Sequence, residues 1–159
     1  VVAAAVPCVP RRGAGERSAM SSLQKRLKLL SFGLMGFGLL DVIAGVFMLV
    51  ASPLAAGLTF DVAGEATDGV IAAEVLGIVG LLVGAYCLVV GVMGARAANN
   101  PRHVSAFKRL DLLLVVACVI EFGLGLASGQ ASWVELVLAV LGTCAFAYAN
   151  KAHDEVVDR

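Results

Sequence analysis

Charged side chains are scarce in this chain. Only 15% of its 159 residues are Asp, Glu, Lys or Arg, whereas a soluble domain usually carries about 25%. Hydrophobic residues make up 60% of the chain, and the mean hydropathy is +0.93. The formal net charge of zero gives no general attraction to nucleic acid. This composition excludes an ordinary soluble domain and indicates a membrane protein.

Motifs for metal binding, cofactor binding and catalysis are missing as well. The four cysteines form no CxxC pair and no Cys/His spacing, and three of them lie in apolar segments, where we expect buried free thiols that act as small hydrophobes. The run GLMGFGLL, residues 33–40, lacks the strand-to-helix context of a phosphate loop. No nucleophile, base and orienting group fall at a useful spacing. We therefore expect no enzyme activity, no cofactor and no metal site.

Long apolar runs are what the sequence has instead. A run of about 20 apolar residues crosses a hydrocarbon layer about 30 Å thick as a helix. Four such runs lie at residues 29–51, 70–95, 110–127 and 131–150. The sequence therefore predicts an all-α fold, an integral membrane four-helix bundle that spans residues 29–150.

Basic residues are confined to alternate connections. All twelve Lys and Arg precede the first run, lie between the second and third, or follow the fourth. Basic residues in short loops stay in the cytoplasm. We therefore expect a bacterial cytoplasmic (inner) membrane with both termini inside. Residues 1–28 would be a basic, largely disordered cytoplasmic segment, and residues 151–159 a short cytoplasmic tail.

The first nineteen residues lack the pattern of a cleaved leader. They have no basic n-region, and Pro7 interrupts their apolar stretch. Met20 begins a run in which Ser21 or Ser22 suits a helix cap before a basic first turn. We interpret residues 1–19 as an over-extended translation start. If they are instead part of the protein, we expect them to be disordered.

Small residues form a stripe on the second apolar run. They recur at alternating steps of three and four, at Ala73, Gly77, Gly80, Gly84, Cys87, Gly91 and Gly94. Helices in a bilayer associate through close van der Waals contact, which small side chains permit. We expect this stripe to be a helix-packing seam; a flexible gating helix is the alternative.

The first and third runs carry matching stripes 80 residues apart. Ser31, Leu34, Gly38, Asp41 and Gly45 correspond to Asp111, Leu114, Cys118, Glu121 and Gly125. The match suggests two tandem helical hairpins of the same orientation, as in parallel-repeat carriers. Since Gly, Leu and Ala are abundant here, chance alignment is the alternative.

Two carboxylates are predicted near mid-membrane. At about 1.5 Å per residue from Leu30, Asp41 lies roughly 17 Å deep, and Glu121 matches it. An ionised carboxylate there costs at least about 2.5 kcal/mol, and no Lys or Arg lies in the core of any span. Three alternatives stay open. The two acids are protonated and share a hydrogen bond across a helix interface, they line a wet cavity, or they hold a cation.

Three further acids are expected near helix ends. Glu74 and Glu135 lie close to the outer boundary, and Asp111 lies just inside the inner one, where Lys108 and Arg109 can offset it. The helix dipole stabilises an acid in the first turn, which accounts for all three without a ligand. Glu74 and Glu135 are also retained as further members of a proton or cation site.

Two strings resemble known membrane families. GARAANNP, Gly94–Pro101, is similar to the motif after the second span of small uncharacterised four-span bacterial membrane proteins. That likeness covers most of the chain after Met20 and implies a fold but no activity. AAEVLG, Ala72–Gly77, is similar to the string around the essential glutamate of small multidrug-resistance transporters. That family carries it deeper, in the first span, so Glu74 is the counterpart in sequence and Asp41 in position.

Two functions follow from these features. The first is a non-enzymatic structural or accessory membrane protein whose protonated acids hold helices together. The alternative is a small proton- or cation-coupled transporter or channel that uses Asp41 and Glu121. The expected partner is the lipid bilayer, with a small cation or proton and a homo-oligomer under the transport hypothesis, and no nucleic acid.

Overall fold

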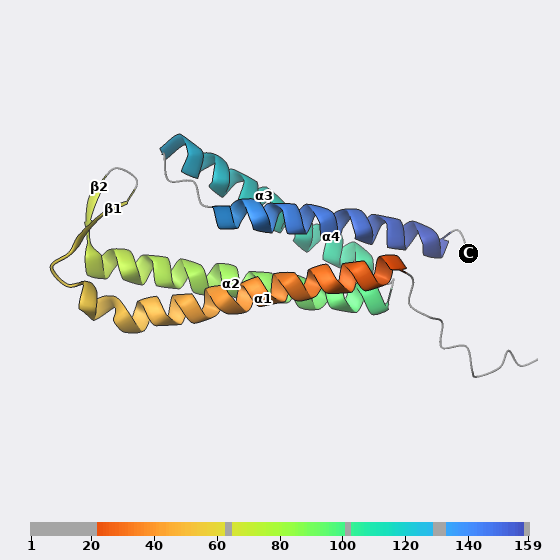
Figure 1. Ribbon diagram of the computed structural model, residues 1–159, viewed down its shortest axis with the longest axis horizontal. Helices are drawn as coiled ribbons and strands as arrows, with labels where there is room; N and C mark the ends of the chain where they lie inside the picture. Colours follow the sequence, from red (N-terminus) through yellow and green to blue (C-terminus); the bar gives the residue numbers. More distant parts are fainter. Residues whose placement is uncertain (1–21, 63–64, 101–102, 129–132, 158–159) are drawn as a thin grey trace, which may run out of the picture.

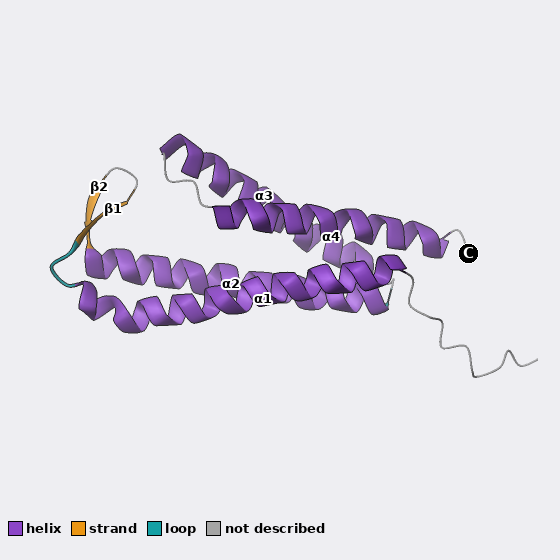
Figure 2. Ribbon diagram, viewed as in Figure 1, coloured by secondary structure: helices purple, strands orange, loops and turns teal. Residues whose placement is uncertain are grey.

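The computed structural model describes residues 22–62, 65–100, 103–128 and 133–157. Within them the chain forms the helices α1 (Ser22–Ala51), α2 (Gly69–Asn99), α3 (Val104–Ser128) and α4 (Trp133–Val157). The predicted all-α architecture is confirmed (Figure 2). The chain also forms elements that the apolar runs did not indicate, namely the short 3-10 helix η1 (Ser52–Ala55) and the antiparallel strands β1 (Thr59–Val62) and β2 (Glu65–Asp68). The predictions for residues 1–19 and Ser21 lie outside the described residues.

Three helical segments are long and apolar enough to cross a membrane. They are Ser22–Ala55, Gly69–Asn99 and Trp133–Lys151. These segments support a membrane protein with transmembrane helices, because a length of about 20 apolar residues matches the hydrocarbon thickness. Helix α3 has 25 residues but carries four charged side chains between Lys108 and Glu121.

The helices form two pairs (Figure 1). Helices α1 and α2 lie antiparallel along most of their length, and α3 pairs with α4. The pairs touch where α1 meets α4 and where α2 meets α3, whereas α1 and α3 make no contact within the described residues. Because α3 is inclined to the other helices, the two pairs diverge toward the end that carries β1 and β2 (Figure 1). We call this end the hairpin end.

Glycine backbones bring α1 and α2 into close contact. A Cβ added at Gly38 would lie 2.7 Å from the carbonyl oxygen of Gly84, and one added at Gly84 would lie 2.7 Å from the carbonyl oxygen of Gly38. Gly45 and Gly77 face each other in the same way, at 2.8 and 3.0 Å. Any larger side chain at these positions would have to displace backbone, which is why glycine is needed here.

The other glycines of the predicted seam differ from one another. Gly91 lies against Met35 and against the carbonyl oxygen of Ser31, 2.9 Å from an added Cβ. Gly94 lies against the Ser31 side chain and, at 2.8 Å, the ring of Phe107 in α3. Gly80 has room, because its added Cβ would meet nothing closer than 3.5 Å. A single stripe thus contains tight contacts and one open position.

The packed core lies in the half of the molecule away from the hairpin end. Its largest fully buried apolar side chains are Phe107, Leu27, Leu34, Val90 and Val104. At the same end the guanidinium of Arg26 in α1 donates to the hydroxyl of Tyr148 in α4 at 3.2 Å. Toward the hairpin end many large apolar side chains are exposed, such as Phe47 and Val79. This surface suits contact with lipid rather than water.

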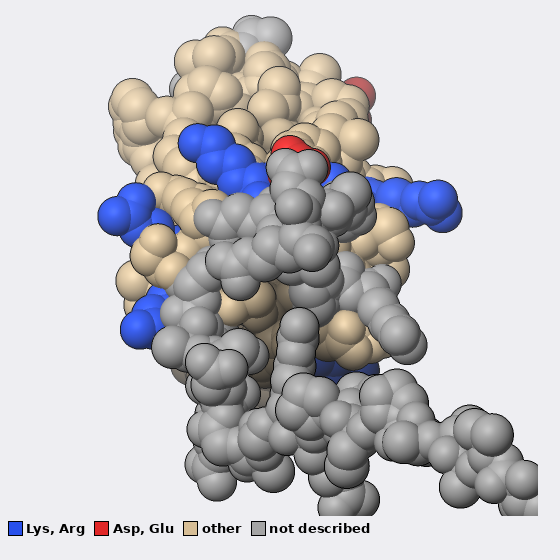
Figure 3. Space-filling model, turned by 90° about the vertical axis from the view of Figure 1, so that its right-hand side faces the viewer, with Lys and Arg blue, Asp and Glu red and all other residues tan. Residues whose placement is uncertain are grey.

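Positive charge gathers at the end opposite β1 and β2. There α1 and α3 begin and α2 and α4 end, and these segments carry all described Lys and Arg. Figure 3 shows the Lys and Arg side chains spread around this face, which we call the basic end. The described hairpin end instead carries acids such as the exposed Glu65 and Asp68. The molecule is therefore electrically polar along its long axis.

Local hydrogen bonds define the helix ends near the connections. The Asp68 carboxylate accepts from the Val70 backbone N–H at 2.9 Å and so caps the start of α2. Gly57 has a φ of 83°, a conformation that glycine adopts without strain. At the other end of α2, the N–H of Asn100 donates to the carbonyl of Arg96 at 2.8 Å.

Candidate functional site

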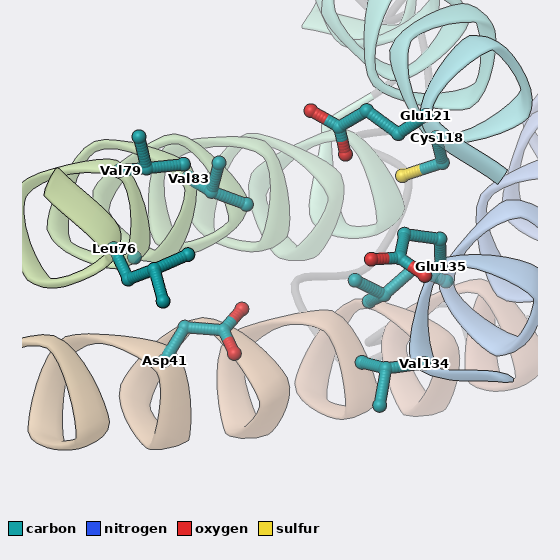
Figure 4. A pocket seen from close by; sticks show the side chains of 10 residues that line it. Asp41, Leu76, Val79, Val83, Cys118, Glu121, Val134 and Glu135 are labelled. Carbon is teal, nitrogen blue, oxygen red and sulfur yellow. The ribbon is translucent and has the colours of Figure 1, made fainter. Parts of the chain in front are cut away.

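A cavity of about 310 Å³ lies between the two helix pairs. Carboxyl groups from three helices line it, namely Asp41 of α1, Glu121 of α3 and Glu135 of α4. Figure 4 shows all three pointing toward the same space, opposite apolar side chains of α2. We call this space the acidic cavity. The structure therefore brings together three acids that are far apart in the sequence.

The glycine seam positions Asp41 and leaves room beside it. Gly84 packs so closely on α1 that its added Cβ would lie 2.9 Å from the Cβ of Asp41. One turn earlier, Gly80 lines the cavity and contributes no side chain to it. A bulkier residue at Gly84 would push α1 away, and a bulkier residue at Gly80 would fill the cavity. The small-residue stripe thus determines where Asp41 lies and how much space it faces.

Helices α3 and α4 supply the other two acids. Glu121 lies in the second half of α3, and Glu135 lies at the start of α4. Glu121 follows Cys118 by one turn on α3, and both line the cavity. Glu135 lies in the first turn of α4, as predicted, where the helix dipole stabilises negative charge. Its Oε2 atom is buried without a hydrogen-bond partner among the described residues. An unpaired buried oxygen of this kind is costly unless a proton or a ligand satisfies it.

A hydrogen bond between Asp41 and Glu121 was one of three open alternatives, and the described residues do not form it. No hydrogen bond joins them in the described part of the chain, and their helices α1 and α3 do not touch. The inclination of α3 opens a space between the helices where the prediction had an interface. The shared lining is compatible with the other two alternatives, a wet cavity and a bound cation.

Glu74 lies apart from the other acids. It is exposed on α2 and does not line the acidic cavity. The first-turn interpretation is also wrong for it, because α2 begins at Gly69 and has no acid in its first turn. The predicted run begins at residue 70, one residue after the helix start, so Glu74 lies beyond the first turn by either boundary. Glu74 therefore serves as a natural control for the cavity acids.

Asp111 is also misplaced by the first-turn interpretation. Helix α3 begins at Val104, and Asp111 lies two turns later with 0% of its surface exposed. Neither carboxyl oxygen has a hydrogen-bond partner among the described residues, so Lys108 and Arg109 do not offset it by contact. The signal was present in the sequence, because Asp111 lies on the same stripe as the buried Leu114.

Other polar groups near the site have partners. The hydroxyl of Tyr86 in α2 donates to the Leu110 carbonyl of α3 at 2.8 Å. Cys87 and Cys118 are buried free thiols as predicted, but Cys144 is exposed. Cys8 lies outside the described residues.

The lining has an unbalanced charge. It contains three carboxyl groups and no Lys, Arg or His. Carboxyl groups without a positive partner in a low-dielectric site bind protons or attract cations. Within the described residues, however, no group of three or more His, Cys, Asp or Glu is arranged to hold a metal ion. The charge of the lining therefore suits protons or cations.

Comparisons with protein-family models, curated proteins and solved structures find no match to this chain. The likenesses to four-span families therefore depend on the short strings at Ala72–Gly77 and Gly94–Pro101 alone. The function is therefore inferred from the geometry of the acidic cavity.

Proposed function

We propose that the protein crosses a bacterial cytoplasmic membrane four times, with α3 as a further crossing and the basic end in the cytoplasm. The length of α3 supports this, since 25 residues at about 1.5 Å each exceed the hydrocarbon thickness of about 30 Å. Its charges support it too. Lys108 and Arg109 lie near the basic end, while Asp111 is covered by protein and Glu121 lines the acidic cavity.

We further propose that the two helix pairs are tandem repeats of one hairpin. Helices α1 and α2 form one pair and α3 and α4 the other. Ser31 and its counterpart Asp111 are both fully buried. Leu34 is also fully buried, and its counterpart Leu114 is only 2% exposed. This agreement in burial supports the 80-residue correspondence. A repeat of this kind would place the acidic cavity between the two hairpins, where carriers bind their substrates.

The proposed function is a small proton- or cation-coupled transporter or channel. The observation that carries it is the convergence of Asp41, Glu121 and Glu135 on one cavity without a basic residue. An ionised carboxylate near mid-membrane costs at least about 2.5 kcal/mol, so Asp41 and Glu121 at that depth favour a bound proton or cation. Intramembrane acids that only join helices would instead be expected to pair directly with one another.

A structural or accessory membrane protein is the second candidate. The close seam between α1 and α2 favours it, because the reciprocal contacts of Gly38 with Gly84 serve packing whatever the acids do. Under this hypothesis the three acids are permanently protonated, and neutral amides would replace them without effect. The two candidates therefore differ in what amide substitution does.

Proton flux in reconstituted vesicles tests the proposal. The full chain is placed in liposomes with a pH gradient, and gradient decay is followed with a trapped pH-sensitive dye, with and without added monovalent or organic cations. We expect Asp41→Asn and Glu121→Gln each to reduce the flux at least tenfold.

The matched control is Glu74→Gln, an acid on the same membrane-spanning scaffold that lies outside the cavity. It should retain wild-type flux. Equal flux in all variants, or none in the wild type, would support the structural candidate. Retention of the folded state is checked for every variant by its thermal unfolding midpoint in detergent.

A further inference from the structure

Asp111 is a buried ionisable group that the proposed cavity does not include. It has no exposed surface, and both of its carboxyl oxygens lack a hydrogen-bond partner among the described residues. A carboxylate in such a site would be desolvated and uncompensated, so the closed arrangement requires a proton on Asp111. A protonated acid without an acceptor is still poorly satisfied. This is the least satisfied polar side chain that the structure describes.

Its surroundings are close and nearly apolar. From α4, an added Cβ at Gly142 would lie 3.3 Å from the Asp111 Oδ1 atom and 2.6 Å from a methyl of Val115. From α2, the Tyr86 ring lies near enough for an electrostatic interaction with Asp111. The Tyr86 hydroxyl is engaged by the Leu110 carbonyl, one residue before Asp111.

Charged groups near Asp111 lie toward the basic end. Lys108 and Arg109 occupy the preceding turn of α3, half-buried and exposed respectively. The titratable group that α2 presents is Tyr86, and the contact from α4 is made at Gly142, which has no side chain. A carboxylate that became accessible here would meet water and positive charge on the basic side only.

Asp111 shares a face of α3 with the acidic cavity. Asp111, Leu114, Cys118 and Glu121 follow at steps of three and four, and the last two line the cavity. The ten residues from Asp111 to Glu121 correspond to about 15 Å along the helix. Leu114, which follows Asp111 on this face, is apolar and only 2% exposed. The face thus carries an acid at each end of this stretch.

We propose that Asp111 is an inner proton-binding residue, which accepts protons from the acidic cavity and releases them at the basic end. The inference rests on the proposed proton function of the cavity. In the transfer, a cavity carboxylic acid loses a proton and becomes a carboxylate, and the Asp111 carboxylate gains it and becomes neutral. Release to water at the basic end regenerates the Asp111 carboxylate. The transfer requires the closed packing around Asp111 to open, because its carboxyl group has no exposed surface.

Infrared spectroscopy of the reconstituted protein tests whether Asp111 changes its protonation. A protonated carboxyl group has a C=O stretching band that a carboxylate lacks, and the difference between wild type and Asp111→Asn assigns it. We expect this band to decrease reversibly as the pH is raised while the protein remains folded. A band of constant intensity across that range would mean a permanently protonated structural group and would overturn the proposal.

Flux measurements separate this inference from the proposed function. We expect Asp111→Asn to reduce proton flux at least tenfold while leaving the pH-dependent infrared bands of Asp41 and Glu121 in place. Wild-type flux in Asp111→Asn, with flux lost in Glu121→Gln, would overturn the role of Asp111 and leave the cavity function intact. Wild-type flux in Asp41→Asn and Glu121→Gln would reject the cavity function and, with it, this inference.

A second variant distinguishes a specific loss of flux from misfolding. Asp111→Leu places an apolar side chain in apolar surroundings, where replacement of a buried ionisable group is commonly tolerated. It should fold even if the buried amide of Asp111→Asn is not accommodated, and it should show the same loss of flux. A folded Asp111→Leu variant with wild-type flux would contradict the proposal.

Discussion

The contact between Gly84 and Gly38 offers the sharpest test of how the scaffold positions the site. In Gly84→Ala, the new Cβ would lie 2.7 Å from the Gly38 carbonyl oxygen, 2.8 Å from the Val42 nitrogen and 2.9 Å from the Asp41 Cβ. All three neighbours are backbone or Cβ atoms, which cannot rotate away. The helices must therefore separate, and Asp41 must move with α1.

The expected cost follows from overpacking. Inserting a methyl group into a close-packed contact typically destabilises by about 1–3 kcal/mol. Alanine recovers up to about 1 kcal/mol of helix propensity relative to glycine, so the net loss is smaller than the contact alone suggests. For a chain of this size each kcal/mol corresponds to about 2–4 °C in Tm. We expect Gly84→Ala to lower the thermal unfolding midpoint by several degrees.

Gly80→Ala is the matched control, one turn away on the same helix. Its Cβ would meet nothing closer than 3.5 Å. It gains the helix propensity without the clash, so the midpoint should stay the same or rise. The assay is thermal unfolding in a mild detergent, followed by circular dichroism. Equal destabilisation by the two substitutions would refute the seam as the structure describes it.

Two further predictions concern the hydrogen bond of Tyr86 and the orientation of the chain. Tyr86→Phe removes the donor to the Leu110 carbonyl, so the free energy of unfolding should fall by about 0.5–1.5 kcal/mol, measured by denaturant unfolding; no change would mean that the bond is not formed. Glu65 is exposed in the hairpin, so Glu65→Cys should react with a membrane-impermeant maleimide on intact cells, whereas Lys151→Cys should react only after permeabilisation. Reversed labelling would invert the proposed orientation.

The helices and the charge asymmetry could be predicted from composition and spacing. Long apolar runs leave the backbone no better way to satisfy its hydrogen bonds in lipid than an α-helix. The stripe at Gly77 and Gly84 indicated a close contact, and those glycines do lie against α1. Periodicity is informative here because small residues on one helical face have one physical use, close approach of backbones.

The boundaries of the helices were harder to derive. Helix α3 begins at Val104, well before the apolar run at 110–127, because polar and basic residues also form helix outside the hydrocarbon layer. This error moved Asp111 from a presumed first turn to a buried interior position. Hydropathy reports the solvent that surrounds a helix, and capping signals report its start; here the two are separated by two turns.

The relation between the acids could be predicted only in part. Equal depth on matching stripes brought Asp41 and Glu121 to one level, but depth alone does not fix the angle between helices. The inclination of α3 decides that these acids face a cavity rather than each other (Figure 1), and such an angle is set by long-range packing between helices. The contribution of Glu135 depends on the same geometry, which a sequence pattern does not encode.

The account depends on acids from different helices sharing one space, and cysteine cross-linking measures this most directly. Asp41→Cys and Glu135→Cys are combined in a chain whose native cysteines are replaced by alanine, and treated with a short, water-soluble bifunctional maleimide. Mass spectrometry should find one linker joining both cysteines, and none joining Glu74→Cys to Glu135→Cys in the control pair. Two separately modified cysteines in the first pair, or joined cysteines in the control, would contradict the shared cavity.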